Sequence, residues 1–195
     1  MTSKWYKSVS ASVPLTQGDI IRDCPVAGWS ETDIAFDGQN ELELLRSARE
    51  EYKIDAIVMT QACDLANNKT SNVILCPHEA LSDYRKSWDE KLEANGKKHT
   101  DKEFRGLFKQ LIDGRVWNQA VLNSGSDGGL STEHRLVDFS EVYSVPRTFL
   151  DRLITNRDNE RLTLMPPYRE YLSQAFARFF MRVGLPTPVE DPFAT

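Results

Sequence analysis

One cysteine, one aspartate and two histidines are the side chains of this sequence best suited to covalent chemistry. Cys63 and Asp64 follow an apolar run, at a point where a strand is expected to give way to a loop. A thiol nucleophile needs a base to accept its proton, and His78 or His134 would serve, with Asp64 orienting the imidazole. However, a cysteine at a strand end is usually a small buried apolar side chain, and aspartate is a common turn residue. A cysteine-dependent hydrolase is therefore the least favoured function class for this sequence.

Cys63, Cys76 and His78 are also the best metal-ligand candidates in the sequence. Structural zinc sites usually contain cysteines in short, closely spaced pairs, and these residues lack that spacing. Together with Cys24 the cysteines are an odd and unclustered set, which is typical of reduced thiols. We therefore expect free thiols, no metal site and no cofactor.

Seven arginines lie between residues 147 and 182, and aromatic residues are interleaved with them. Because Arg178 and Arg182 are four residues apart, they would lie on one face of a helix. Such a pattern is typical of a surface for RNA or for an acidic protein, although arginines of this kind also pair with carboxylates on a solvated surface. The candidate partner-binding residues are Arg147, Arg169, Arg178 and Arg182, with Gln61 at the end of an expected strand.

The overall composition limits the class of protein. The chain has 195 residues, 27% of them charged, and a net charge of −5, which suit one globular domain and argue against a broad nucleic-acid or membrane surface. No stretch approaches the length of about 18 apolar residues that a membrane span needs, and no apolar run follows the polar N-terminus. We therefore expect a single cytoplasmic domain over residues 1–195 that makes no membrane contact.

Residues 14–78 have the pattern of the first half of a β-rich domain. A turn at residues 17–19 leads into a strand over 20–24, and the glycines and prolines of 25–39 predict a loop. Helix-capping residues then predict a helix over 40–51.

Two nearly continuous apolar runs, 55–60 and 72–77, are the strongest strand signals in the sequence. The polar, asparagine-rich residues between them predict a hairpin with a long loop. Apolar residues at every position indicate strands that are covered on both faces. We therefore expect this hairpin at the centre of a strongly bent sheet of five or more strands.

Residues 79–132 interrupt the β pattern and predict a helical insertion. A capping box at residues 100–103 opens its second helix, and the glycine- and serine-rich residues 123–129 predict a flexible loop. Residues 133–185 hold the remaining strands and a C-terminal helix, and 186–195 form a loose tail.

The C-terminal helix has an unusually aromatic apolar stripe. Phe176, Phe179 and Phe180 recur at helical spacing along it. This stripe either packs against the sheet, with Phe176 buried at its middle, or remains exposed as a partner-binding or dimer face.

Three fragments of the sequence resemble the MazF/PemK toxin family. TQGDII looks like the glycine-aspartate start of the family's first strand, and AIVMTQACDLANNKTSNVILCP looks like its central hairpin. HRLVDFSEVYSVPRTFL looks like its late strand and the following turn. The resemblance implies an α+β fold, a small SH3-like β-barrel carrying a helical insertion and a C-terminal helix.

The same resemblance implies an endoribonuclease site, but one of its residues is replaced. The family has an arginine at the start of the central strand, and this arginine stabilises the negative charge of the phosphate. This sequence has Asp55 at that place, and its carboxylate would repel the phosphate. The family's serine or threonine at the start of the next strand is matched by Thr70 or Ser71. Three other arginines could supply the missing cation: Arg22, Arg135 and Arg147.

These observations favour a non-enzymatic binding or regulatory module. As the resemblance implies, it would act in bacterial stress response, in a toxin–antitoxin system or in phage defence. It would contact a protein partner or single-stranded RNA, through the insertion and the arginine-rich C-terminal third. The alternative is a sequence-selective, metal-independent endoribonuclease of the MazF type, and a homodimer is compatible with either class.

Overall fold

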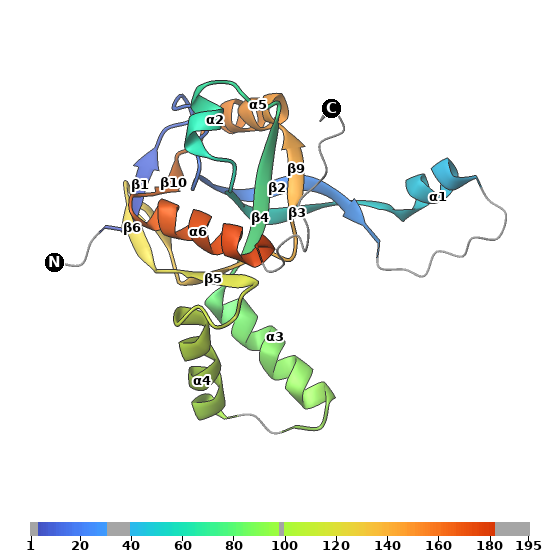
Figure 1. Ribbon diagram of the computed structural model, residues 1–195, viewed down its shortest axis with the longest axis vertical. Coiled ribbons are helices and arrows are strands. Elements are labelled where there is room, and N and C mark those ends of the chain that lie inside the picture. Colours follow the sequence, from blue (N-terminus) through green and yellow to red (C-terminus); the bar gives the residue numbers. More distant parts are fainter. Residues whose placement is uncertain (1–3, 31–39, 98–99, 182–195) are drawn as a thin grey trace, which may run out of the picture.

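The computed structural model describes residues 4–30, 40–97 and 100–181 (Figure 1). Helices and antiparallel strands both contribute to the fold, as the sequence predicts. The largest sheet contains β2 (Ile20–Trp29), β3 (Arg49–Val58), β4 (Asn72–Ala80), β5 (Gln119–Leu122), β8 (Arg135–Asp138) and β9 (Tyr143–Pro146). Its strand order is β2-β3-β4-β8-β5, and β9 also pairs with β4.

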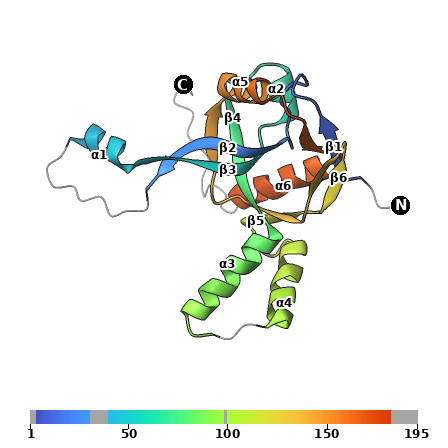
Figure 2. The same ribbon diagram turned by 180° about the vertical axis from the view of Figure 1, so that it is seen from behind.

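Helices lie on both faces of this sheet and at its ends (Figures 1 and 2). Those in the described residues are α1 (Glu41–Ala48), α2 (Ala62–Ala66), α3 (Leu81–Ala94), α4 (Asp101–Ile112), α5 (Arg147–Arg157) and α6 (Tyr168–Phe180). None of the helices in this part of the chain is long and apolar enough to cross a membrane.

The predicted hairpin is confirmed at the centre of the sheet. Residues 56–58 of β3 pair with residues 75–77 of β4, and β4 continues on to pair with β8 and β9. Ile57 packs in a core cluster with α6, whereas Val58 packs in a second cluster with α5, because successive side chains of a strand point to opposite faces. The apolar runs are continuous because both faces of the hairpin are covered.

No sheet in residues 4–30, 40–97 and 100–181 closes into a barrel, which differs from the barrel expected from the sequence. β1 (Tyr6–Val9) and β10 (Arg161–Leu164) form a separate two-stranded sheet. This sheet reaches the turn before β2 through the isolated bridge between Asp19 and Thr163, where regular pairing is interrupted. The N-terminal segment therefore adds a strand beside β10.

A buried ion pair holds these two sheets together. Asp19 is 0% exposed, and its Oδ2 accepts a hydrogen bond from Nε of Arg161 at 2.8 Å. The other nitrogens of this guanidinium donate to the carbonyls of Ser10, Val13 and Pro14. One carboxylate therefore fixes β2, β10 and the segment after β1 relative to one another.

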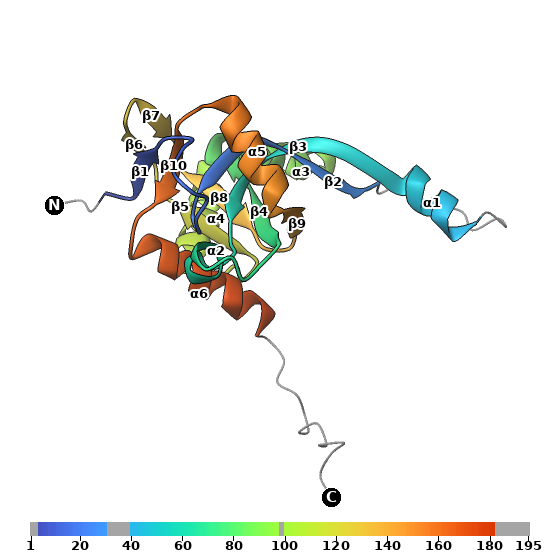
Figure 3. The same ribbon diagram turned by 90° about the horizontal axis from the view of Figure 1, so that it is seen from above.

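β2 and β3 extend beyond the body as a two-stranded arm that carries α1 (Figure 3). Two boundaries predicted from the sequence were wrong here. The helix predicted over 40–51 ends at Ala48, and part of the loop predicted over 25–39 is strand. Backbone pairing explains both, because residues 27–29 pair with residues 49–51 and override the local helix preference. Residues 31–39 lie outside the described chain.

α3 and α4 form a helical pair that points away from the body (Figures 1 and 2). The capping box at the start of α4 is confirmed, since Thr100 and Glu103 each bond the other's backbone nitrogen. The two helices meet through Trp88 and Phe104, whose ring centroids are 5.4 Å apart, and the guanidinium of Arg85 lies 4.4 Å from the centre of the Phe104 ring.

The residues after α4 form strands, not the flexible loop that was predicted over 123–129. β5 joins the main sheet beside β8, and β6 (Gly125–Asp127) pairs with β7 (Leu130–Thr132) in a hairpin. Gly128 and Gly129 have φ angles of 57° and 84° in the two-residue turn. The glycines thus make a tight hairpin turn, for which residues with positive φ are preferred.

The aromatic stripe of α6 packs against the sheet over only part of its length. Phe176 is half-buried, with its ring centroid 5.5 Å from that of Phe139, and Leu172 is the fully buried residue of the helix. Phe180, one turn further on, is 58% exposed. The packing alternative is therefore confirmed for Phe176, which is partly and not fully buried, whereas the end of the stripe at Phe180 is exposed.

Candidate ligand-binding site

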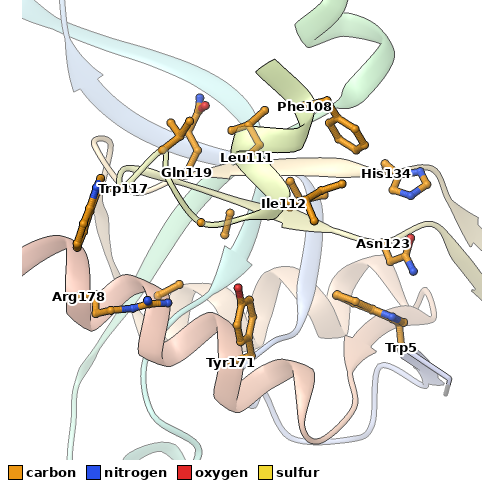
Figure 4. A pocket seen from close by; sticks show the side chains of 15 residues that line it. Trp5, Phe108, Leu111, Ile112, Trp117, Gln119, Asn123, His134, Tyr171 and Arg178 are labelled. Atoms are coloured by element: carbon orange, nitrogen blue, oxygen red, sulfur yellow. The ribbon is translucent and has the colours of Figure 1, made fainter. Parts of the chain in front are cut away.

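A cavity of about 340 Å³ lies between the end of α4, strand β5 and helix α6 (Figure 4). Segments from five parts of the chain line it: residue 5, the α4–β5 region, the residue after β5, the residue before β8, and α6. Its volume is at the lower end of the range for small-ligand sites, and its lining is mostly apolar.

Aromatic side chains form the walls of this cavity, which we call the aromatic cavity. Trp5 stacks on Tyr168 with ring centroids 3.9 Å apart and planes 12° apart, which holds the indole in place. Phe108 meets the ring of His134 edge to face, at 6.1 Å and 85°. Trp117 and Tyr171 are 53% and 49% exposed, so the cavity is open to solvent beside them. Figure 4 shows Trp117, Tyr171 and Trp5 along one side of the space.

A few polar side chains interrupt the apolar lining. Arg178 comes from α6 and lies between Trp117 and Tyr171 in Figure 4, whereas His134 and Asn123 lie toward the other end. The backbone of His134 is fixed by a hydrogen bond from the Leu81 amide to its carbonyl, at 2.8 Å. No carboxylate of the described residues lies within ion-pair distance of Arg178. The cavity therefore carries one positive charge beside exposed aromatic faces.

This arrangement is suited to binding a flat ligand that carries an anionic group. Aromatic walls stack on a planar ring, and a guanidinium attracts both an anion and the electrons of a ring. The cavity contains no nucleophile beside a base, since its lining residues include no cysteine, serine, threonine or carboxylate. The geometry thus supports binding and does not assemble a catalytic group.

The cysteine-dependent hydrolase is not assembled by the structure. Cys63 is exposed on α2, and its thiol lies 3.7 Å from oxygen atoms of Gln61 and Asp64. His78 is buried on β4, and His134 lines the aromatic cavity, so the described contacts join neither imidazole to the thiol. Cys24, Cys63 and Cys76 are all free, and the described residues include no cluster of three or more metal-ligating side chains.

His78 instead belongs to a buried polar cluster with Arg135 and Asp55. Arg135 is 7% exposed and donates from Nε to Nδ1 of His78 at 2.6 Å and from Nη2 to Oδ2 of Asp55 at 2.5 Å. Burial, followed by the charges of Arg135 and Arg22, lowers the pKa of His78 to about 3. Because Nδ1 accepts a hydrogen bond, the neutral imidazole carries its proton on Nε2.

The structure places the candidate nuclease residues in two separate groups. Arg147 is adjacent to Ser71, because its amide donates to the Ser71 carbonyl at 2.8 Å. Its guanidinium, however, donates to the Leu65 carbonyl and to Asn68, and the Thr70 hydroxyl donates to a backbone carbonyl. Arg135 lies on β8, where it is opposite Ala80 at the far end of β4 from Ser71, and it is paired with Asp55. The two nominated arginines of this region therefore do not come together beside Ser71.

The remaining candidate residues differ in how available they are. Arg169 forms an ion pair with Glu170 at 2.7 Å, and Gln61 is exposed beside Cys63. Arg182 lies outside the described residues. Arg178 is the candidate partner-binding arginine that lines the aromatic cavity, and His134, a residue nominated for a different role, lines the other end of it.

The sequence interpretation did not include Trp5, Trp117 and Tyr171. Trp5 and Trp117 belong to no periodic apolar pattern, and Tyr171 is one of several aromatic residues of the C-terminal helix. Nothing in the sequence marks these three as members of one cavity, because only the fold brings residues 5, 117 and 171 together.

Comparison with known proteins gives no family for this chain. Its sequence matches no protein-family model and no curated protein. The functional argument therefore depends on the geometry of the chain itself.

Proposed function

We propose that this chain is a non-enzymatic binding module, related in fold to the MazF/PemK family, that holds single-stranded RNA through an unpaired base in the aromatic cavity. The observation that carries the proposal is that two partly exposed rings, Trp117 and Tyr171, and the guanidinium of Arg178 line one cavity. The setting in bacterial stress response or defence is part of the same proposal.

Stacking supplies most of the affinity in this proposal. A base stacked on an aromatic side chain contributes about 1–3 kcal/mol, and every base offers a flat face to Trp117 or Tyr171. The amide of Asn123, which lines the cavity, would hydrogen-bond the edge of a base, in the way that single-stranded RNA is usually read. Arg178 would pair with the adjacent phosphate.

The charge of the chain sets the character of this binding. With a net charge of −5, the protein has no broad cationic surface for a long stretch of RNA backbone. The protein therefore neutralises few phosphates, and its affinity for RNA should depend only weakly on salt. A plot of log affinity against log salt concentration should have a slope near −0.7 for each phosphate contact. A short contact that depends on base stacking suits this negative net charge better than a long cationic groove along the RNA backbone does.

The first test replaces one wall of the cavity. Trp117→Ala is expected to weaken binding of a short uridine-rich RNA by about 5- to 150-fold, because one stacking contact is lost. The matched control is Trp29→Ala, which removes an indole that is 64% exposed on the arm, and this change should leave affinity within about twofold. Fluorescence anisotropy of labelled RNA lacking a terminal phosphate measures both.

Two outcomes would contradict the proposal. One is the absence of saturable RNA binding by the unmodified protein. The other is an equal loss in Trp117→Ala and Trp29→Ala, which would place binding away from the cavity. A peptide that binds and is not displaced by RNA would favour the protein-partner alternative.

We also expect no RNA cleavage by the purified chain. A cation or donor that stabilises the developing negative charge contributes about 2.7–4 kcal/mol to such reactions. Nε of Arg147 lies 3.6 Å from the Asp151 carboxylate and Arg135 is paired with Asp55, so a carboxylate competes with the phosphate at each of these cations. Labelled RNA should stay intact with wild-type protein, and the double variant Thr70→Ala, Ser71→Ala should behave identically. Cleavage that the double variant abolishes would establish the nuclease alternative.

A further inference from the structure

A second cavity, of about 360 Å³, lies on the other side of the β6–β7 hairpin from the aromatic cavity, with which it shares no lining residue. It is bounded by the start of β2, the turn side of the hairpin, the end of α5 and the start of β10. Two cationic side chains from distant parts of the chain, Arg22 and Arg157, line it together with an apolar wall.

Both guanidiniums are held by backbone carbonyl groups instead of carboxylates. Arg22 donates from Nη2 to the carbonyl of Ser131 at 3.1 Å. Arg157 donates from Nη1 to the carbonyl of Arg22 and from Nη2 to the carbonyl of Asp23, both at 2.6 Å. In the part of the chain that the structure describes, neither guanidinium has a carboxylate oxygen within 4.0 Å.

The positions of these arginines depend on an irregularity in β2. Pairing with β3 shifts between Ile21 and Cys24, and Asp23 there has a φ of 48°, which is uncommon for a residue other than glycine. The amide of Asp23 is held by a carboxylate oxygen of Asp55 at 3.1 Å. The bulge turns the carbonyls of residues 22 and 23 toward α5, and a bulge commonly redirects side chains in this way.

The other charges on the cavity wall do not neutralise these arginines. Arg161 is already paired with Asp19, so that pair adds no net charge. Glu160 also lines the cavity, but its carboxylate accepts a hydrogen bond from the Ser8 hydroxyl at 2.9 Å and forms no ion pair with either guanidinium. Two positive charges in one cavity repel each other, and a bound anion would remove that repulsion.

We propose that this second cavity binds a phosphate group carried by a small ligand. A guanidinium has five N–H donors, and the carbonyl groups take one of them in Arg22 and two in Arg157. The phosphate would accept charge-assisted hydrogen bonds from the donors that remain on these two side chains. The organic part of the ligand would contact the apolar wall of Ile20, Leu130 and Leu162. This site is independent of the proposed RNA contact, since it uses none of the residues of the aromatic cavity.

The decisive variant is Arg22→Gln, since Arg22 is exposed and its side chain makes one described hydrogen bond. Inorganic phosphate and uridine 5′-monophosphate are titrated separately into wild-type protein by calorimetry, with amide chemical shifts followed in parallel. The variant is expected to lose about tenfold or more in affinity for both, in proportion to a lost charge-assisted hydrogen bond. Arg152→Gln, on the exposed side of α5, removes the same charge outside the cavity and should leave affinity within about twofold.

The ligand series identifies the source of the phosphate. Binding of uridine 5′-monophosphate but not of uridine would support a phosphate site for a small phosphorylated ligand. If an RNA without a terminal phosphate also binds more weakly to Arg22→Gln, the site takes a backbone phosphate of the same chemistry. Arg157→Lys keeps the charge but removes the paired nitrogens, and it should weaken phosphate binding if the variant folds.

The proposal is overturned if millimolar phosphate gives no saturable signal, or if Arg22→Gln binds phosphate as wild type does. Neither outcome bears on the aromatic cavity, which is tested with RNA lacking a terminal phosphate and with Trp117→Ala. Conversely, loss of RNA binding in Trp117→Ala with phosphate binding unchanged would leave both proposals in place as separate sites.

Discussion

Replacing Asp19 by alanine is expected to lower the free energy of unfolding by about 3–5 kcal/mol, because the change leaves the guanidinium of Arg161 buried without its partner. Asp19 is 0% exposed and Arg161 is 7% exposed, so solvent cannot substitute for the lost carboxylate. The amide of Thr16 also loses its hydrogen bond to Oδ2, which fixes the turn before β2. Urea denaturation of wild type and variant at pH 7 measures the difference.

A double variant separates the ion pair from packing. Asp19→Ala with Arg161→Met removes both charges, and it should recover a part of the loss, since replacing both members of a buried pair is far less costly than breaking it. Asp151→Ala is the surface control. Its carboxylate lies 3.6 Å from Arg147 and is 47% exposed, so its loss should cost less than about 1 kcal/mol. An Asp19→Ala cost below that of the control would show that the pair does not hold the sheets together.

Asp19 also illustrates what the sequence could and could not predict. The turn at residues 17–19 and the strand after it follow from local residue types, and the structure confirms both. The partner of Asp19, however, is separated from it by 142 residues, and no local pattern identifies such a pairing. The same limit applies to Asp55, which the sequence marked as a missing arginine and which the fold pairs with Arg135, 80 residues away.

Elements with strong periodic signals were predicted well. The β3–β4 hairpin, the capping box of α4 and the start of α6 were all anticipated, because apolar runs and capping residues act over a few positions. The β6–β7 hairpin was missed because its short strands are as polar as a loop and are stabilised by contact with β1. Helix α5 was missed although Phe149, Leu150, Leu153 and Ile154 recur at helical spacing, because its first residues were interpreted as the turn after the late strand.

The candidate site was predicted only as separate residues. His134 was nominated as a base and Arg178 as a binding residue, and neither role suggested that they line one cavity. Both residues line the cavity because β5 pairs with β8 in the main sheet, and this pairing brings the end of α4 close to α6. That pairing depends on four residues of β5, which have too little alternation to be recognised in the sequence alone.

The largest pH effect on stability is expected from His78. In the folded protein its pKa is lowered to about 3, from an ordinary value of 6.5, first by burial and then by the charges of Arg135 and Arg22. Protonation would also place a hydrogen on Nδ1, where the imidazole now accepts a hydrogen bond from Arg135 at 2.6 Å. The folded state therefore resists a proton that the unfolded chain takes up readily.

The sign of the effect follows from this difference. Above pH 6.5 the imidazole is neutral in both states and stability is fully retained, whereas below it the unfolded state binds a proton that the folded state does not. Stability is then lost as pH falls toward about 3. At 1.36 kcal/mol per pH unit, the loss due to this residue should reach about 3 kcal/mol near pH 4.5.

The measurement compares wild type with His78→Asn, in which the asparagine oxygen can still accept a hydrogen bond from Arg135 but cannot be protonated. Carboxylates contribute equally to both proteins, so the difference between their unfolding free energies isolates His78. That difference should shift in favour of the variant by about 3 kcal/mol between pH 7 and pH 4.5. His134→Asn is the matched control, because its ring lines the aromatic cavity instead of the buried cluster, and it should follow the wild-type curve. Parallel curves for wild type and His78→Asn would mean that the imidazole is protonated in the folded state, and the buried cluster would then need a different arrangement of hydrogen bonds.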